Sequence, residues 1–270
     1  MARRTEKEKR LLLREYIKLE RQESRSLTGK PKKPGLMDKV RKKVPEKAMK
    51  SLQKAFEKGL FLIFDKGDEI IGKIGAMDKA MKEAEKYRRS LNLMVHKDTL
   101  KAIDNAAVSR IRTTKGTTVL EGAGLGIFGI GLPDIPIFLA MLLKTAYEIG
   151  ASYGFDYRDE DEKPYTLAML KVAFSDGEER IAYSKACDEL GKKIDDDELI
   201  DNDVDESDLK EVAEVLSTDM LVGKFIQGMT FVGVVGGVIN YKLVDKIAEV
   251  AKVKYKKRFL YRLINDKSDD

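Results

Sequence analysis

Apolar residues recur every three or four positions through most of this chain, which is the spacing of one face of an α-helix. The stretch from Pro45 to Phe64 is typical, with apolar side chains at Ala48, Leu52, Ala55, Phe56, Leu60 and Ile63. Further helices are predicted over residues 5–22, 66–89, 98–113, 164–175, 178–193 and, with a break near the glycines at 233–237, 209–263. No segment shows the alternation of a strand, and no internal repeat has a fixed period. The pattern predicts an all-α fold.

The segment SLTGKPKKPG (26–35) ends the first helix with two glycines and two prolines. That first helix is highly charged and has a narrow apolar stripe of Leu12, Tyr16 and Leu19. We therefore expect residues 1–35 to form a basic helical extension and linker. Residues 36–263 are expected to form the helical domain, and residues 264–270 a polar tail.

The stretch LEGAGLGIFGIGLPDIP (120–136) contains GLGIFG, which matches the dinucleotide-binding pattern G-x-G-x-x-G. That site needs a strand, a tight glycine turn and a helix that begins at the pyrophosphate. Only TTVL (117–120) resembles a strand, and Pro133 and Pro136 interrupt the region where the helix should follow. No alternation of strands and helices surrounds the motif. The glycines therefore indicate packing rather than nucleotide binding.

Helical spacing explains these glycines better. Gly122, Gly126 and Gly129 fall on one helix face, and Gly233 and Gly237 form a second G-x-x-x-G pair. A glycine inside a helix costs roughly 0.5–1 kcal/mol relative to alanine, so close contact between helices must compensate. We expect a multi-helix globular bundle in which the two glycine-rich apolar segments pack together.

The same segments allow a membrane interpretation. Residues 122–143 carry one charge, Asp134, and residues 225–241 carry none. A spanning helix needs about 20 apolar residues, but the PDIP sequence indicates a hairpin whose arms are each too short. A buried hairpin and a membrane-inserted or re-entrant hairpin both stay open.

Charge is distributed unevenly. Residues 1–50 hold 18 Lys and Arg against 7 Asp and Glu, whereas residues 156–214 hold 8 against 21. The end of the chain, KVKYKKRFLYR (252–262), is basic again and is compatible with nucleic acid, an anionic membrane surface or the acidic segment of its own fold. Nucleic acid is disfavoured because aromatic residues are not interleaved with the N-terminal charges. We expect an anionic membrane surface to be contacted by four cations: Lys254, Lys256, Lys257 and Arg258.

Residues 122–177 resemble the central signature of the EcsC family. A glycine-rich stretch leads into a D-x-P turn at Asp134 and Pro136, and a helix then ends in Tyr153-Gly154-Phe155-Asp156 before an acidic link. Residues 232–260 are similar to the family's ending, in which a glycine pair precedes an asparagine and a basic helix closes the chain. The positions that fit are Gly236, Gly237, Asn240, Ala251, Arg258, Phe259 and Leu260. The resemblance covers roughly residues 36–263.

The founding member of that family is encoded beside a bacterial ABC transporter, which implies an accessory role at the cytoplasmic face of the cell membrane. The resemblance brings no catalytic residue and no cofactor with it. We expect a non-enzymatic accessory protein whose partner is an anionic membrane or a membrane protein complex. The alternative is a ligand-binding or hydrolytic enzyme with a site near the glycine-rich hairpin and Asp134.

Four polar residues are candidate functional or structural anchors: Asp134, Tyr153, Asp156 and Asn240. An aspartate in an apolar segment is costly to bury unless it is paired or hydrogen-bonded. Asp134 is therefore expected to cap the helix that follows it, to pair with a base, or to bind a ligand at the hairpin tip.

No catalytic set or metal site is predicted. His96 has no second histidine or nucleophile tied to it and is interpreted as a helix-boundary residue, and Cys187 as a small core residue. The stretch DNDVDESDLKEV (201–212) lacks the glycine and the final glutamate of a calcium loop, so a helix-capping acidic loop is expected. A single cysteine and a charged start without a signal peptide favour the cytoplasm.

Overall fold

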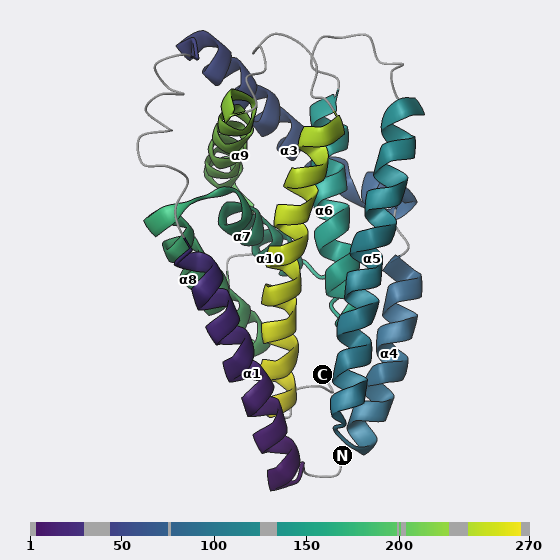
Figure 1. Cartoon of the computed structure of the whole chain (residues 1–270). Helices are drawn as coiled ribbons and strands as arrows, with labels where there is room; N and C mark the ends of the chain where they lie inside the picture. Colours follow the sequence, from purple (N-terminus) through teal and green to yellow (C-terminus); the bar gives the residue numbers. More distant parts are fainter. Residues whose placement is uncertain are drawn as a thin grey trace.

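The computed structural model describes residues 4–29, 44–74, 77–124, 134–198, 200, 204–226 and 237–265. Over these residues the chain forms helices and no strand, so the predicted all-α fold is confirmed (Figure 1). The helices are α1 (Glu6–Leu27), α3 (Glu46–Ile74), α4 (Met77–Leu93), α5 (Lys97–Gly124), α6 (Asp134–Ser152), α7 (Glu162–Phe174), α8 (Gly177–Asp195), α9 (Glu206–Ile226) and α10 (Gly237–Ile264).

Two long helices organise the bundle. α10 runs down the middle of the molecule and packs against α1, α5, α6, α7 and α8, while α6 packs against α3, α4, α5 and α10 (Figure 1). Every residue from Leu142 to Tyr153 is buried, including the polar Lys144, Thr145, Glu148 and Ser152. These two helices hold the centre of the core.

Two glycines that the sequence analysis did not single out permit this close packing. A Cβ atom at Gly150 in α6 would lie 2.7 Å from the ring of Tyr255 in α10. A Cβ atom at Gly59 in α3 would lie 2.8 Å from Leu139 in α6. A small residue lets another helix approach closely, and at Gly150 it leaves room for the whole ring of Tyr255.

The first helix belongs to the body of the protein. Leu12 and Leu19 are buried in the main core, and α1 packs along α10 and α8. Its start is fixed by a capping box, in which the Thr5 hydroxyl accepts from the Glu8 N–H and the Glu8 carboxylate accepts from the Thr5 N–H. The expectation that residues 1–35 form an extension outside the helical domain is therefore wrong for α1. Its narrow stripe is enough because α1 packs mainly against one helix, α10.

The predicted glycine contact falls mostly outside the described residues. Gly126, Gly129 and Gly233 are not described, whereas Gly122 lies in α5 and Gly237 begins α10. The C-terminal end of α5 and the N-terminal ends of α6 and α10 lie at the same end of the bundle (Figure 1). The contact between the two glycine-rich segments stays a prediction.

The segment before the GLGIFG motif is helical. Residues 117–120, which could have been a strand, lie within α5. The strand that a dinucleotide-binding turn requires is therefore missing at this position. Among the helices of the described ranges, none is both long enough and apolar enough to cross a bilayer.

Candidate functional site

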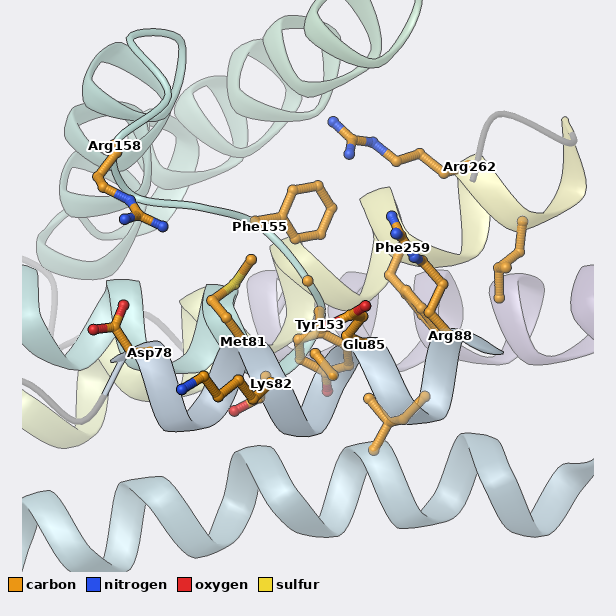
Figure 2. A pocket seen from close by; sticks show the side chains of 15 residues that line it. Asp78, Met81, Lys82, Glu85, Arg88, Tyr153, Phe155, Arg158, Phe259 and Arg262 are labelled. Carbon is orange, nitrogen blue, oxygen red and sulfur yellow. The ribbon is translucent and has the colours of Figure 1, made fainter. Parts of the chain in front are cut away.

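A cavity of about 530 Å³ lies between α4 and α10, and we call it the α4–α10 pocket. Figure 2 shows side chains entering it from α4, from α10 and from the turn that follows α6. Its apolar lining comes mainly from Met81, Ile103, Tyr153, Phe155, Phe259 and Leu263. Its charged lining comes from Asp78, Lys82, Glu85, Arg88, Arg158 and Arg262. The volume is in the range of about 300–1,000 Å³ that is usual for small-molecule sites.

The turn Tyr153-Gly154-Phe155-Asp156 forms one wall of this pocket. Gly154 has a φ of +88°, in the region that favours glycine, and its N–H donates to the Ala151 carbonyl. The Phe155 N–H donates to the Gly150 carbonyl, so the backbone of the turn closes α6 tightly. The turn at residues 153–156, which resembles the family signature, therefore places the Phe155 side chain in the pocket.

Tyr153, one of the predicted polar anchors, is fixed in position through its hydroxyl. Its hydroxyl donates to Asp104 in α5 at 3.0 Å, and Lys256 in α10 donates to the other oxygen of the same carboxylate. Burial and the neighbouring charge of Asp104 raise the pKa of Tyr153 well above its ordinary value. This hydroxyl remains neutral and fixes the wall to two helices.

Asp156, the second predicted anchor, is tied to Arg158 at the edge of the pocket. Its Oδ1 accepts from the backbone N–H and from Nε of Arg158, at 3.0 and 2.8 Å. These hydrogen bonds hold the pKa of Asp156 below its ordinary value, although partial burial opposes ionisation. Asp156 orients Arg158 and is itself not one of the lining residues.

Phe155 supports two arginines of α10. The guanidinium carbon of Arg258 lies 4.4 Å from the ring centroids of both Phe155 and Tyr165, and that of Arg262 lies 4.6 Å from Phe155. Stacking of a guanidinium on an aromatic face is favourable, by roughly 0.5–2 kcal/mol depending on solvent exposure. The aromatic turn and the basic helix therefore position each other.

Buried carboxylates fix the same arginines. Arg258 contacts Glu162 of α7 at 2.7 Å and Asp195 of α8 at 2.8 Å, and Arg262 Nε donates to Asp195 at 2.7 Å. Burial opposes the charge on Arg258, but Glu162 and Asp195 outweigh it, so the pKa of Arg258 lies above its ordinary value. Such pairs are stable only when each charge keeps its partners.

Two lysines of α10 form a second buried cluster. Lys254 contacts Glu23 of α1 and Asp188 of α8, both at 2.7 Å. Lys257 contacts the same two carboxylates at 2.8 and 2.6 Å. The two lysines thus fasten α1 and α8 to α10.

The four cations expected to face a membrane are therefore inside the protein. Lys254, Lys257 and Arg258 are buried, and Lys256 is largely covered and paired with Asp104. The expectation of an exposed basic face on this helix is wrong. Three of their partners, Glu162, Asp188 and Asp195, belong to the acidic segment 156–214. That segment was one of the three partners left open for the basic end of the chain. The sequence pattern showed the charged face but could not show what covers it.

The other predicted anchors lie away from the pocket. Asp134 is the first residue of α6, about 27 Å along the helix axis from Ser152 at the pocket end. Asn240 lies in the first turn of α10. The side chains of both are outside the described residues, so capping or pairing by Asp134 stays a prediction. An enzymatic site built around Asp134 would be separate from the α4–α10 pocket.

Cys187 and His96, the two residues considered for nucleophilic or metal chemistry, do not line the pocket. Cys187 is fully buried, and burial raises the pKa of its thiol to about 12, which confirms its interpretation as a core residue. His96 is exposed between α4 and α5, as a helix-boundary residue. No group of three or more potential metal ligands occurs within the described ranges. Asp205 caps α9 by accepting from the Asp208 N–H.

A second feature lies where α4 meets α5, and we call residues 91–96 the α4–α5 tip. Leu93 is 87% exposed and Met94 is 52% exposed. The tip is ordered by α1, because Glu8 accepts from the Val95 N–H at 2.8 Å and Arg4 donates to the Leu91 carbonyl. Leu93 is the last residue of α4 and Met94 follows it, so the tip adjoins a helix that also lines the pocket.

Sequence reasoning missed the pocket cations and the tip. Arg88 and Arg262 lie 174 positions apart in the sequence, and nothing in their local pattern joins them. The apolar run LNLMV was visible, but helical spacing alone does not show that Leu93 and Met94 point outward. The turn at 153–156 was the one available signal, because an aromatic–glycine–aromatic sequence after a long apolar helix predicts a tight, packed corner.

Comparison with known proteins places the chain in a family. The family model described as "EcsC protein family" matches residues 11–260, a range that includes most of α1. The chain is 26% identical over 193 residues to "Protein EcsC" of Bacillus subtilis (strain 168), covering 68% of this chain and 77% of that protein. It is 25% identical over 177 residues to "Uncharacterized protein YdbA" of the same organism, covering 61% of this chain and 60% of that protein.

No solved structure matches this chain at a significant level. The family match extends over far more than half of the chain and includes the pocket turn, the tip and every residue of the two buried ion clusters except Arg262. The chain therefore belongs to the EcsC protein family.

Proposed function

We propose that this protein is a non-enzymatic accessory protein that docks on an anionic membrane through its α4–α5 tip. The observation that carries the proposal is the exposure of Leu93 and Met94, two neighbouring apolar side chains, on an ordered turn. Single exposed apolar residues are common on protein surfaces, but a projecting pair surrounded by cations is typical of membrane-contacting loops.

Charge around the tip favours an anionic surface. Residues 85–101 contain five cations and two carboxylates, and the cations are all exposed: Lys86, Arg88, Arg89, Lys97 and Lys101. One of the two carboxylates, Glu85, is already paired with Arg89. Each exposed cation near an anionic leaflet contributes about 1 kcal/mol, and salt screens this attraction.

The apolar pair adds a contribution that salt does not screen. Transfer of a leucine or methionine side chain from water to an apolar medium is favourable by about 1.5–3 kcal/mol. Together these terms support reversible, peripheral binding. They do not require any helix to cross the bilayer. The tip thus takes the role that the sequence analysis gave to the cations of α10.

The family resemblance supplies the setting. We infer that the membrane is the cytoplasmic face of the cell membrane and that the partner there is a membrane complex such as an ABC transporter. The docked tip would leave free for that partner the opposite end of the bundle, where α5 ends and α6 and α10 begin (Figure 1).

Sedimentation with vesicles tests the proposal. The full chain is expected to sediment with vesicles of phosphatidylglycerol and phosphatidylcholine at low salt, and less at high salt. The double variant Leu93→Ser/Met94→Ser is expected to lose most of this binding. The matched control is Phe61→Ser/Leu62→Ser, which alters an exposed apolar pair of α3, 57% and 40% exposed, far from the tip in sequence. Equal binding by the two double variants would overturn the proposal, and so would no binding by the wild-type chain at low salt.

A further inference from the structure

The α4–α10 pocket has the two features of a site for an amphiphilic anion: an apolar interior and cations at its edge. The interior is built from Ile103, Tyr153, Phe155 and Leu263, all of which are buried. These side chains come from α5, the turn and α10, so the interior is assembled by three parts of the fold. An apolar interior of this size suits an alkyl chain or a ring system.

Arg262 is the fixed cation of the pocket. Its Nε is bound to the fully buried carboxylate of Asp195, and its guanidinium lies on the ring of Phe155. Its two terminal amino groups make no hydrogen bond with any residue in the described ranges. Figure 2 shows this guanidinium reaching over Phe155. A fixed, stacked guanidinium with free donors is well suited to a carboxylate or phosphate.

Arg88 supplies a second cation from the opposite wall. It lies on α4, is exposed, and makes no ion pair with the residues that the structure describes. Figure 2 shows Arg88 rising from α4 at the end of the pocket where Arg262 extends from α10. Of the two carboxylates that line the pocket, Glu85 is engaged by Arg89. Positive charge therefore dominates this edge.

We propose that the α4–α10 pocket binds a single-chain amphiphile with an anionic head. The alkyl chain occupies the interior beside Phe155 and Leu263, and the carboxylate or phosphate monoester binds Arg262 and Arg88. The site does not depend on membrane docking by the tip, and its ligand can come from solution or from a bilayer.

Calorimetric titration of the full chain with dodecyl phosphate, below its critical micelle concentration, tests the site. One molecule is expected to bind per chain, at least tenfold more tightly than dodecyltrimethylammonium, which has the same chain and the opposite charge. Arg88→Gln is expected to weaken dodecyl phosphate binding about tenfold, equivalent to about 1.4 kcal/mol. Lys86→Gln removes the charge of an exposed lysine of α4 that does not line the pocket, and is expected to leave binding unchanged.

A substitution in the apolar lining tests the binding of the alkyl chain separately from the binding of the charged head. Met81→Gln places an amide in the apolar lining and is expected to weaken binding of both dodecyl phosphate and dodecanol. Equal affinity for the anionic and cationic amphiphiles would overturn the proposal, as would equal effects of Arg88→Gln and Lys86→Gln, or no binding by the folded wild-type chain.

Two further arms identify the source of the ligand. Dodecyl phosphate is offered either free or in phosphatidylcholine vesicles, to the wild type and to Leu93→Ser/Met94→Ser. Uptake from vesicles that requires the intact tip indicates a membrane source, and uptake only from solution indicates a soluble one. Both results support the site, and failure of vesicle docking with retained binding of free ligand would overturn the proposed function alone.

Discussion

Lys257 near the end of α10 and Glu23 near the end of α1 form an ion pair of 2.8 Å across 234 positions of sequence. The same glutamate also binds Lys254. A helix that would otherwise be a charged extension is thereby joined to the central helix of the bundle. Because α1 also orders the α4–α5 tip, this pair connects the core of the fold with the surface proposed to meet the membrane.

Neutralising Glu23 tests this link. In Glu23→Gln the buried Lys254 and Lys257 share one carboxylate, and breaking a buried ion pair costs about 3–5 kcal/mol. We expect the free energy of unfolding in urea to fall by an amount near the lower end of that range. Glu20→Gln, on the exposed side of the same helix, is the control and should change the free energy by less than about 0.5 kcal/mol.

The same pair makes stability depend on acid pH. Burial of Glu23 opposes its ionisation, but the charges of Lys254 and Lys257 outweigh burial and hold the pKa of Glu23 below its ordinary value of 4.5. A lowered pKa means that the stabilisation is complete above the ordinary value and is lost as pH falls through the lower, folded value. Between about pH 5 and pH 3 the wild type should therefore lose more stability than Glu23→Gln. Parallel pH profiles of the two proteins would contradict this.

Leu12 and Leu13 test whether α1 is part of the core. The two leucines are neighbours in sequence, but Leu12 is 0% exposed and Leu13 is 49% exposed. Leu12→Ala should lower the free energy of unfolding by about 2–5 kcal/mol, whereas Leu13→Ala should change it by less than about 0.5 kcal/mol. If α1 were an extension, the two substitutions would have similar, small effects in urea denaturation.

Gly150 and Gly59 test the close packing of α6. Gly150 faces the ring of Tyr255, which is fully buried and whose hydroxyl donates to Glu162, so the ring cannot move aside. Gly59 faces the end of the flexible Leu139 side chain. Alanine is better than glycine in a helix by roughly 0.5–1 kcal/mol, which offsets the clash at Gly59 but not at Gly150.

We therefore expect Gly150→Ala to destabilise the protein by about 1–3 kcal/mol, and Gly59→Ala to have a clearly smaller effect. Thermal and urea denaturation of the two variants, measured together, make the comparison. A Gly150→Ala protein as stable as the wild type would mean that α6 and α10 are not packed as closely as the structure places them.

The sequence pattern predicted the helices well because local spacing decides them. Helix 164–175 appears as α7, and the interruption near His96 appears as the α4–α5 tip. The position of α1 could not be predicted, because Glu23 binds Ser184 and Lys257, which lie 161 and 234 positions away in the sequence. A narrow apolar stripe is compatible with a solvated helix as well as with a packed one.

The candidate site was harder to predict than the fold. The turn at 153–156 was identified, but the cations of α10 were assigned to the surface. Their acidic partners lie on α1, α7 and α8, and no local pattern shows that Lys254 meets Glu23 and Asp188. Sequence shows which face of a helix is charged, whereas only the packing of the other helices shows whether solvent or carboxylates cover that face.

Fluorescence from a tryptophan placed at the tip tests membrane docking most directly. The chain contains no tryptophan, so Leu93→Trp gives a single reporter, and Phe61→Trp on α3 gives a matched exposed control. With anionic vesicles that contain brominated acyl chains, the account predicts a blue shift and strong quenching for Leu93→Trp and neither change for Phe61→Trp. Unchanged emission from Leu93→Trp, or equal quenching of the two reporters, would contradict it.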